Sequence, residues 1–101
     1  MSKTTITQQA DGLFQIKGEL NANTVPGLWR AASELVKGAS QDLVFDLQAV
    51  TRSDSAGLAL LIEWMRQAQE KNLQIQFRNL PAQMWAIAKV SDLENVIPLA
   101  E

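Results

Sequence analysis

Hydrophobic and polar positions follow two different periods along this chain, and each change of period marks a predicted element. Alternating or unbroken apolar runs predict five strands, at residues 4–9, 13–17, 43–47, 73–77 and 96–97. The run Leu43–Leu47 is apolar with only one interruption, which indicates a strand buried inside a sheet. Asp11-Gly12 is typical of a tight turn, so the first two strands are expected to pair as a hairpin.

Apolar residues at helical spacing predict three helices, near residues 25–37, 55–70 and 82–90. Pro26 suits the first turn of the first helix, and Gly38 closes it. The second helix carries one stripe made of Leu58, Leu61, Ile62, Met65 and Ala68. Strands that alternate with helices after a hairpin predict an α/β fold, with a mixed sheet of four or five strands and about three helices packed against it. At 101 residues, one domain spanning 1–101 is expected.

The composition of the chain excludes several kinds of chemical site. The chain has no Cys and no His, which removes disulfides, thiol chemistry, most zinc sites and the usual general base. A net charge of −2 predicts no general affinity for nucleic acid. No apolar run approaches the ~20 residues that span a bilayer, and the first residues lack the apolar region of a signal peptide, so a cytoplasmic protein is expected.

Ser55 is the candidate functional residue, because the pattern places its hydroxyl at a helix N-terminus directly after a buried strand. Asp54 is the predicted N-cap, and Gly57 would let other backbone approach. Ser55 is either an ordinary first-turn hydroxyl or a regulated contact residue. The chain has no His that could act as a base, and no Lys lies close to Ser55 in sequence. Asp46 and Asp54 could bind a cation weakly, but the simpler interpretation is that Asp46 ends a strand and Asp54 caps a helix. We therefore expect no catalytic residue, no metal and no cofactor.

Several large apolar residues lie beside the predicted core stripes. Leu60 and Trp64 form a thin second line on another face of the second helix, while Trp29 and Trp85 flank the stripes of the other two. Such residues are either core-edge residues or docking residues, since Trp is common in both settings. The predicted partner-binding set is therefore Asp54, Ser55, Ala56, Gly57, Leu60, Trp64 and Trp29.

The stretch from Val44 to Leu61, VFDLQAVTRSDSAGLALL, resembles the signature of STAS domains, the family of anti-sigma-factor antagonists. That signature is a hydrophobic strand ending in Asp-Leu, a short turn and then Asp-Ser-(Ser/Thr)-Gly-Leu. The resemblance implies the STAS fold. In the antagonists the first hydroxyl residue after the Asp accepts phosphate, and Ser55 occupies that position here.

A finer resemblance is to the MlaB family, the STAS subunits of Gram-negative phospholipid ABC transporters. It is carried by Gly57–Leu61, by the helix opening Val25–Trp29, and by Ala86–Val90 with Val96–Pro98. It implies a non-enzymatic subunit that contacts an ATPase subunit (MlaF-like) through the hydroxyl at the Ser55 position, within a complex with an inner-membrane permease and without direct membrane insertion. The family commonly has Thr at that position, followed by Gly where this chain has Ala56, and these departures are mild.

The alternative implied by the STAS resemblance is a sigma-factor regulator. In that case a kinase-type anti-sigma factor docks on the second helix and phosphorylates Ser55. The phosphate adds about −1.5 to −2 charges, which would break the docking.

Overall fold

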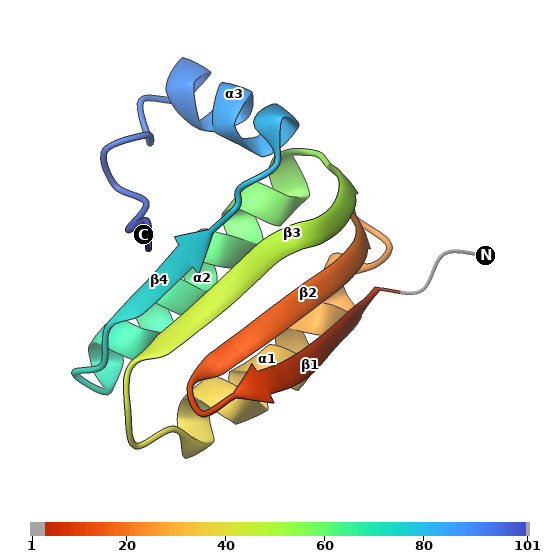
Figure 1. Ribbon diagram of the computed structural model, residues 1–101. Coiled ribbons are helices and arrows are strands. Elements are labelled where there is room, and N and C mark those ends of the chain that lie inside the picture. Colours follow the sequence, from red (N-terminus) through yellow and green to blue (C-terminus); the bar gives the residue numbers. More distant parts are fainter. Residues whose placement is uncertain (1–3, 101) are drawn as a thin grey trace.

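The structure is a computed structural model that describes residues 4–100, and it consists of a mixed sheet with three helices (Figure 1). The elements are β1 (Thr5–Ala10), β2 (Leu13–Leu20), α1 (Val25–Gly38), β3 (Leu43–Ser53), α2 (Ser55–Glu70), β4 (Ile75–Arg78) and α3 (Ala82–Val90). The predicted α/β fold is confirmed within these residues, and residues 1–3 and 101 of the predicted domain lie outside them.

The four strands lie in the order β1-β2-β3-β4, with β1 antiparallel to β2 and the other two pairings parallel. Helices α1 and α2 connect the parallel strands and cover one face of the sheet, whereas α3 lies beyond the end at which the parallel strands finish (Figure 1). None of the helices in the described residues is long and apolar enough to cross a membrane.

Strand β3 continues six residues beyond the predicted end at Leu47 and finishes at Ser53. Its second half pairs with the end of β2, which continues to Leu20, beyond the predicted end at Lys17, so that Lys17 lies opposite Ala49 and Leu20 opposite Ser53. The register shifts twice in this region, and Gly18 has a φ of +115°, a conformation that side chains disfavour. These irregularities break the two-residue period, and for that reason the sequence pattern suggests a polar turn where the strand continues.

The brief fifth strand expected at residues 96–97 does not form. The C-terminal segment pairs with the edge of β4 at one residue, where the Phe77 N–H donates to the Pro98 carbonyl at 2.9 Å and the Ala100 N–H donates to the Phe77 carbonyl at 2.8 Å. Pro98 has no N–H and cannot continue this pairing toward Ile75. The sheet therefore has four strands in the described part of the chain.

An aromatic stack joins α2 to the centre of the sheet. The ring of Phe45 lies 4.9 Å from Trp64 and 6.1 Å from Phe77, measured between centroids. Trp64 is 0% exposed and Leu60 is 2% exposed. The expectation that these two residues line an exposed face is therefore wrong. α2 packs against both the sheet and α1, so its buried arc is wider than the single predicted stripe.

A lysine from one helix caps another. Lys71, directly after α2, donates from its ammonium group to the carbonyl of Lys37 and, at 3.0 Å, to that of Ala39. These carbonyls lie at the C-terminal end of α1, where a helix has unpaired acceptors and a partial negative charge. The contact fixes the relative position of the two helices at the end of the molecule remote from Ser55.

Asp46 lies on the face of the sheet that the helices leave uncovered, because its neighbour Phe45 points into the core. It is 8% exposed and accepts hydrogen bonds from Asn79 (3.0 Å), from the Gln48 N–H (2.9 Å) and from Arg78 (3.3 Å). Burial raises the pKa of Asp46, but these hydrogen bonds outweigh it and hold that pKa below its ordinary value. Asp46 therefore ties β3 to β4 in mid-strand; it does not end a strand, as the sequence suggested.

We expect Trp64→Ala to lower the free energy of unfolding by about 3–5 kcal/mol, because it leaves a large cavity under the aromatic stack. Trp85→Ala is the matched control. The Trp85 side chain is only partly buried, so Trp85→Ala should lower the free energy of unfolding by less than half as much as Trp64→Ala. Urea unfolding of the three proteins measures both values. Equal losses would contradict the assignment of Trp64 to the core centre.

The stability of the protein should fall as the pH is lowered through the folded pKa of Asp46. A carboxyl whose pKa is depressed by folding stabilises the native state above its unfolded pKa, and protonation removes that contribution. Urea unfolding between about pH 6 and about pH 3 should therefore show a shallower pH dependence for Asp46→Asn than for the parent chain. Identical slopes for the two proteins would show that Asp46 contributes nothing to the acid sensitivity.

Candidate functional site

The candidate site lies where β3 ends and α2 begins, at the end of the sheet where ligands of open α/β folds commonly bind (Figure 1). Asp54 is the N-cap, as predicted: its Oδ1 accepts a hydrogen bond from the Ala56 N–H at 2.8 Å. The Gly57 N–H donates to the Asp54 carbonyl at 3.1 Å. These two bonds occupy the N–H groups of Ala56 and Gly57, and the side chain of Ser55 takes no part in them.

Hydrogen bonds from other elements hold this junction in place. The Asp54 N–H donates to the carbonyl of Leu20, at the end of β2, at 3.2 Å. The Ser53 N–H donates to Oε1 of Gln83, in the first turn of α3, at 3.2 Å. Ser53 is 5% exposed, and its hydroxyl donates to the Asp54 carbonyl at 3.1 Å. The start of α2 is therefore attached to β2 and α3 as well as to β3.

Gly57 allows α2 to approach the sheet closely. A Cβ at this position would overlap the Ser53 hydroxyl and would lie 3.0 Å from the Leu20 Cβ. The prediction that backbone would approach Gly57 is wrong, because the atoms nearest to this position belong to the side chains of Ser53 and Leu20. Gly57 is buried, so its part in any partner contact is to set the position of the helix.

Ser55 is exposed at the first position of α2. Its hydroxyl makes no hydrogen bond to any other residue between 4 and 100, in contrast to the Ser53 hydroxyl, which is bonded to backbone. Asp54 is exposed and Ala56 is half-buried beside it. Asp54, Ser55 and Ala56 therefore form one accessible surface, called the Ser55 surface below.

The remaining predicted partner-binding residues lie elsewhere. Leu60 and Trp64 are in the core and do not reach the Ser55 surface. Trp29 is half-buried, one turn before Ser33, whose hydroxyl is bonded to Gln67 of α2 at 3.2 Å. Trp29 therefore lies on the flank of α1 that faces α2, in agreement with the core-edge alternative for that residue.

The sequence analysis missed Gln83. It lies 30 residues after its partner Ser53, in a helix with no motif of its own, and no local pattern connects the two residues. Only the position of α3 over the start of α2 brings them together (Figure 1).

The chemical groups at this junction suit the binding of a partner. Asp46 is bonded to Arg78 and Asn79 whereas Asp54 caps α2, so the structure separates the two carboxylates considered as a cation site. Residues 4–100 contain no cluster of three or more acidic residues able to hold a metal ion. The Ser55 hydroxyl can donate and accept hydrogen bonds, and the helix N-terminus favours a negatively charged group.

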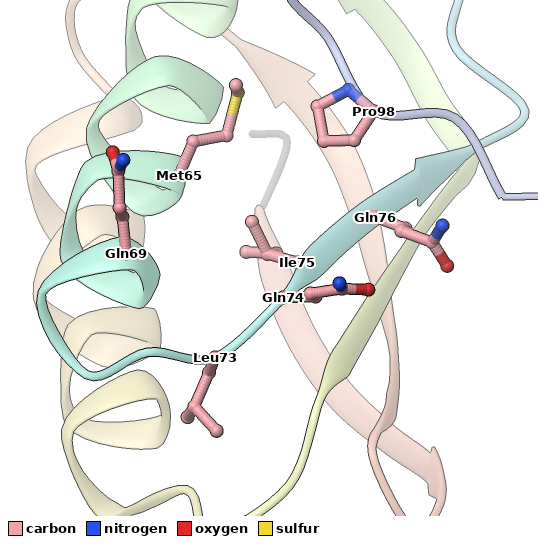
Figure 2. Close-up of a pocket in the computed structure, with 7 residues that line it drawn as sticks. All are labelled: Met65, Gln69, Leu73, Gln74, Ile75, Gln76 and Pro98. Carbon is pink, nitrogen blue, oxygen red and sulfur yellow. The ribbon is translucent and has the colours of Figure 1, made fainter.

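A groove of about 400 Å³ lies far from this site. Figure 2 shows its lining, which comes from the second half of α2, from the connection between α2 and β4, from β4 and from the C-terminal segment: Met65, Gln69, Leu73, Gln74, Ile75, Gln76 and Pro98. Gln69 follows Ser55 by 14 residues, about 21 Å along the helix axis. The groove has no charged side chain, and it does not adjoin the Ser55 surface.

Known proteins resemble this chain over almost its whole length. It is 28% identical over 99 residues to the intermembrane phospholipid transport system binding protein MlaB of Escherichia coli (strain K12), covering 97% of this chain and 99% of that protein. A chain of the Acinetobacter MlaFEDB complex in an ATP-bound conformation superimposes with a TM-score of 0.79 at 23% identity, covering 93% and 99% of the two chains.

The phosphorylated form of the Bacillus cell fate determinant SpoIIAA superimposes with a TM-score of 0.70 at 19% identity, covering 97% of this chain and 91% of that chain. At these identities the two superpositions establish the fold. The family described as "Mlab, STAS domain" matches residues 4–99. On that match, the chain belongs to the MlaB family of STAS domains.

Proposed function

We propose that this protein is a non-enzymatic subunit of a phospholipid ABC transporter and that it binds the transporter's ATPase subunit, an MlaF-like protein, through the Ser55 surface. The single observation that carries the proposal is the exposed, unbonded hydroxyl of Ser55 at the rigidly held start of α2. The similarity to a transport system binding protein and to a chain of the MlaFEDB complex supports the transporter context.

The proposed role is to stabilise the assembled form of the ATPase. A protein that binds one state of its partner and not another increases the population of that state by mass action, without chemistry of its own. Residues 4–100 offer a surface hydroxyl and no nucleophile–base pair, which fits this role. The protein would then lie on the cytoplasmic side of the inner membrane, held there by its complex with the ATPase and the permease.

The rigidity of the junction supports a contact role for Ser55. Hydrogen bonds from β2 and α3 and the close packing of Gly57 set the position of the first turn before any partner arrives. A preorganised contact loses little conformational entropy on binding, so a single hydrogen bond there contributes more to affinity than one from a mobile loop.

The alternative function is an anti-sigma-factor antagonist that a serine kinase switches by phosphorylating Ser55. One observation favours it: the hydroxyl is accessible at a helix N-terminus, where the helix dipole stabilises a phosphate. The similarity of the fold to phosphorylated SpoIIAA is compatible with this role. Membership of the MlaB family favours the transporter role over it.

Ser55→Ala should fold like the parent chain but bind the cognate MlaF-like ATPase roughly 5- to 150-fold more weakly, because it removes one desolvated hydrogen bond of about 1–3 kcal/mol. Ser55→Asp should weaken binding further, since it brings a charge into the contact. Ser55→Thr retains the hydroxyl and serves as the conservative control. Calorimetric titration of the purified ATPase with each variant measures the affinity, and the ATPase rate of the reconstituted transporter measures the consequence.

The transporter proposal would fail if Ser55→Ala bound and activated the ATPase like the parent protein. Recovery of a serine kinase instead of an ABC ATPase, on affinity purification from the native organism, would favour the antagonist alternative. The isolated chain should show no ATP hydrolysis in these assays, and a rate that persists through further purification would contradict a non-enzymatic subunit.

A further inference from the structure

Gln83 combines two features that make it a candidate contact residue. Its Oε1 accepts the hydrogen bond from the buried N–H of Ser53, two residues before Ser55, while the residue as a whole is exposed. The amide cannot be turned round, since a backbone N–H requires an acceptor and only the oxygen provides one. The NH₂ end is therefore directed away from Ser53, and it makes no hydrogen bond to any residue between 4 and 100.

We infer that Gln83 is a second contact residue, which presents its NH₂ group to a hydrogen-bond acceptor on the same ATPase partner that Ser55 contacts. The inference rests on the proposed function and extends it to α3. The contact surface is then built from the first turns of two helices, α2 and α3, which lie together at one end of the sheet (Figure 1).

The chemistry of this surface specifies what the partner must offer. The Gln83 NH₂ group is a pure donor, and the Ser55 hydroxyl can also donate. A backbone carbonyl or a carboxylate on the partner suits each of the two groups, and the partial positive charge at the start of α2 favours a carboxylate near Ser55. The occupant of the surface is therefore a loop or helix end of the ATPase that carries acceptor oxygens.

The Gln83→Glu variant distinguishes a contact with the partner from a purely structural role in bonding the Ser53 N–H. It retains an oxygen acceptor for the Ser53 N–H, so the junction keeps its hydrogen bond, but it replaces the NH₂ donor with a negatively charged oxygen. Gln69→Glu is the matched control, because it makes the same change on an exposed glutamine about 21 Å from Ser55 along α2. Gln83→Ala removes both functions of the side chain.

The experiment titrates the purified MlaF-like ATPase with the parent protein and with four variants: Gln83→Glu, Gln83→Ala, Gln69→Glu and Ser55→Ala. The amide shift of Ser53, read by NMR, reports whether its hydrogen bond survives. We expect Gln83→Glu to keep the parent's melting temperature and the Ser53 shift while binding about tenfold more weakly, with Gln69→Glu unchanged.

Parent-like binding of Gln83→Glu alongside weakened binding of Ser55→Ala would overturn the inference and leave the proposed function standing. Tighter binding of Gln83→Glu would also overturn it, since the partner would then be presenting a donor. If Gln83→Ala weakened binding but Gln83→Glu did not, Gln83 would act only by positioning Ser53. Parent-like binding of Ser55→Ala would instead refute the proposed function itself.

Discussion

The close contact between α2 and the ends of β2 and β3 determines the geometry of everything around the candidate site. Gly57 lies against Ser53 and Leu20, and a side chain at position 57 would push the helix away from the sheet. Because α2 begins only two residues after β3 ends, such a shift would move the cap at Asp54 and the hydroxyl at Ser55 with it. The position of the Ser55 surface is thus a consequence of packing at a single glycine.

The same contact also determines how the core and α1 pack against α2. With α2 close to the sheet, Trp64 reaches the ring of Phe45 and fills the core between helix and strand. α1 then packs along the other flank of α2, where Ser33 and Gln67 share a hydrogen bond and Lys71 caps the end of α1. Each of these contacts limits rotation or sliding of α2, so the start of the helix is rigid although it is exposed.

α3 has a different part in the fold from α1 and α2. It covers the end of the sheet and is attached to the junction by the hydrogen bond between Ser53 and Gln83 (Figure 1). A partner that contacts the start of α2 therefore meets α3 as well. The surface at this end of the sheet is therefore formed by α3 together with the start of α2.

The sequence alone was sufficient for the three helices, four of the five predicted strands, the N-cap at Asp54 and the first-turn position of Ser55, because each depends on residues within a few positions of one another. Helical periodicity and cap chemistry are local, and so is the signature that placed the chain among STAS domains. The strand at 43–47 was predicted too short because the two register shifts that extend β3 depend on its pairing with β2.

Only the tertiary structure decided which side chains are buried and which are brought together. Leu60 and Trp64 looked like a surface line because a helical pattern shows the spacing of apolar residues but not how many neighbours a helix has. Asp46 looked like a strand end, and its bonds to Arg78 and Asn79 come from 32 and 33 residues away. Gln83 reaches Ser53 across 30 residues for the same reason: contacts between distant segments arise from the path of the whole chain, and no local pattern records them.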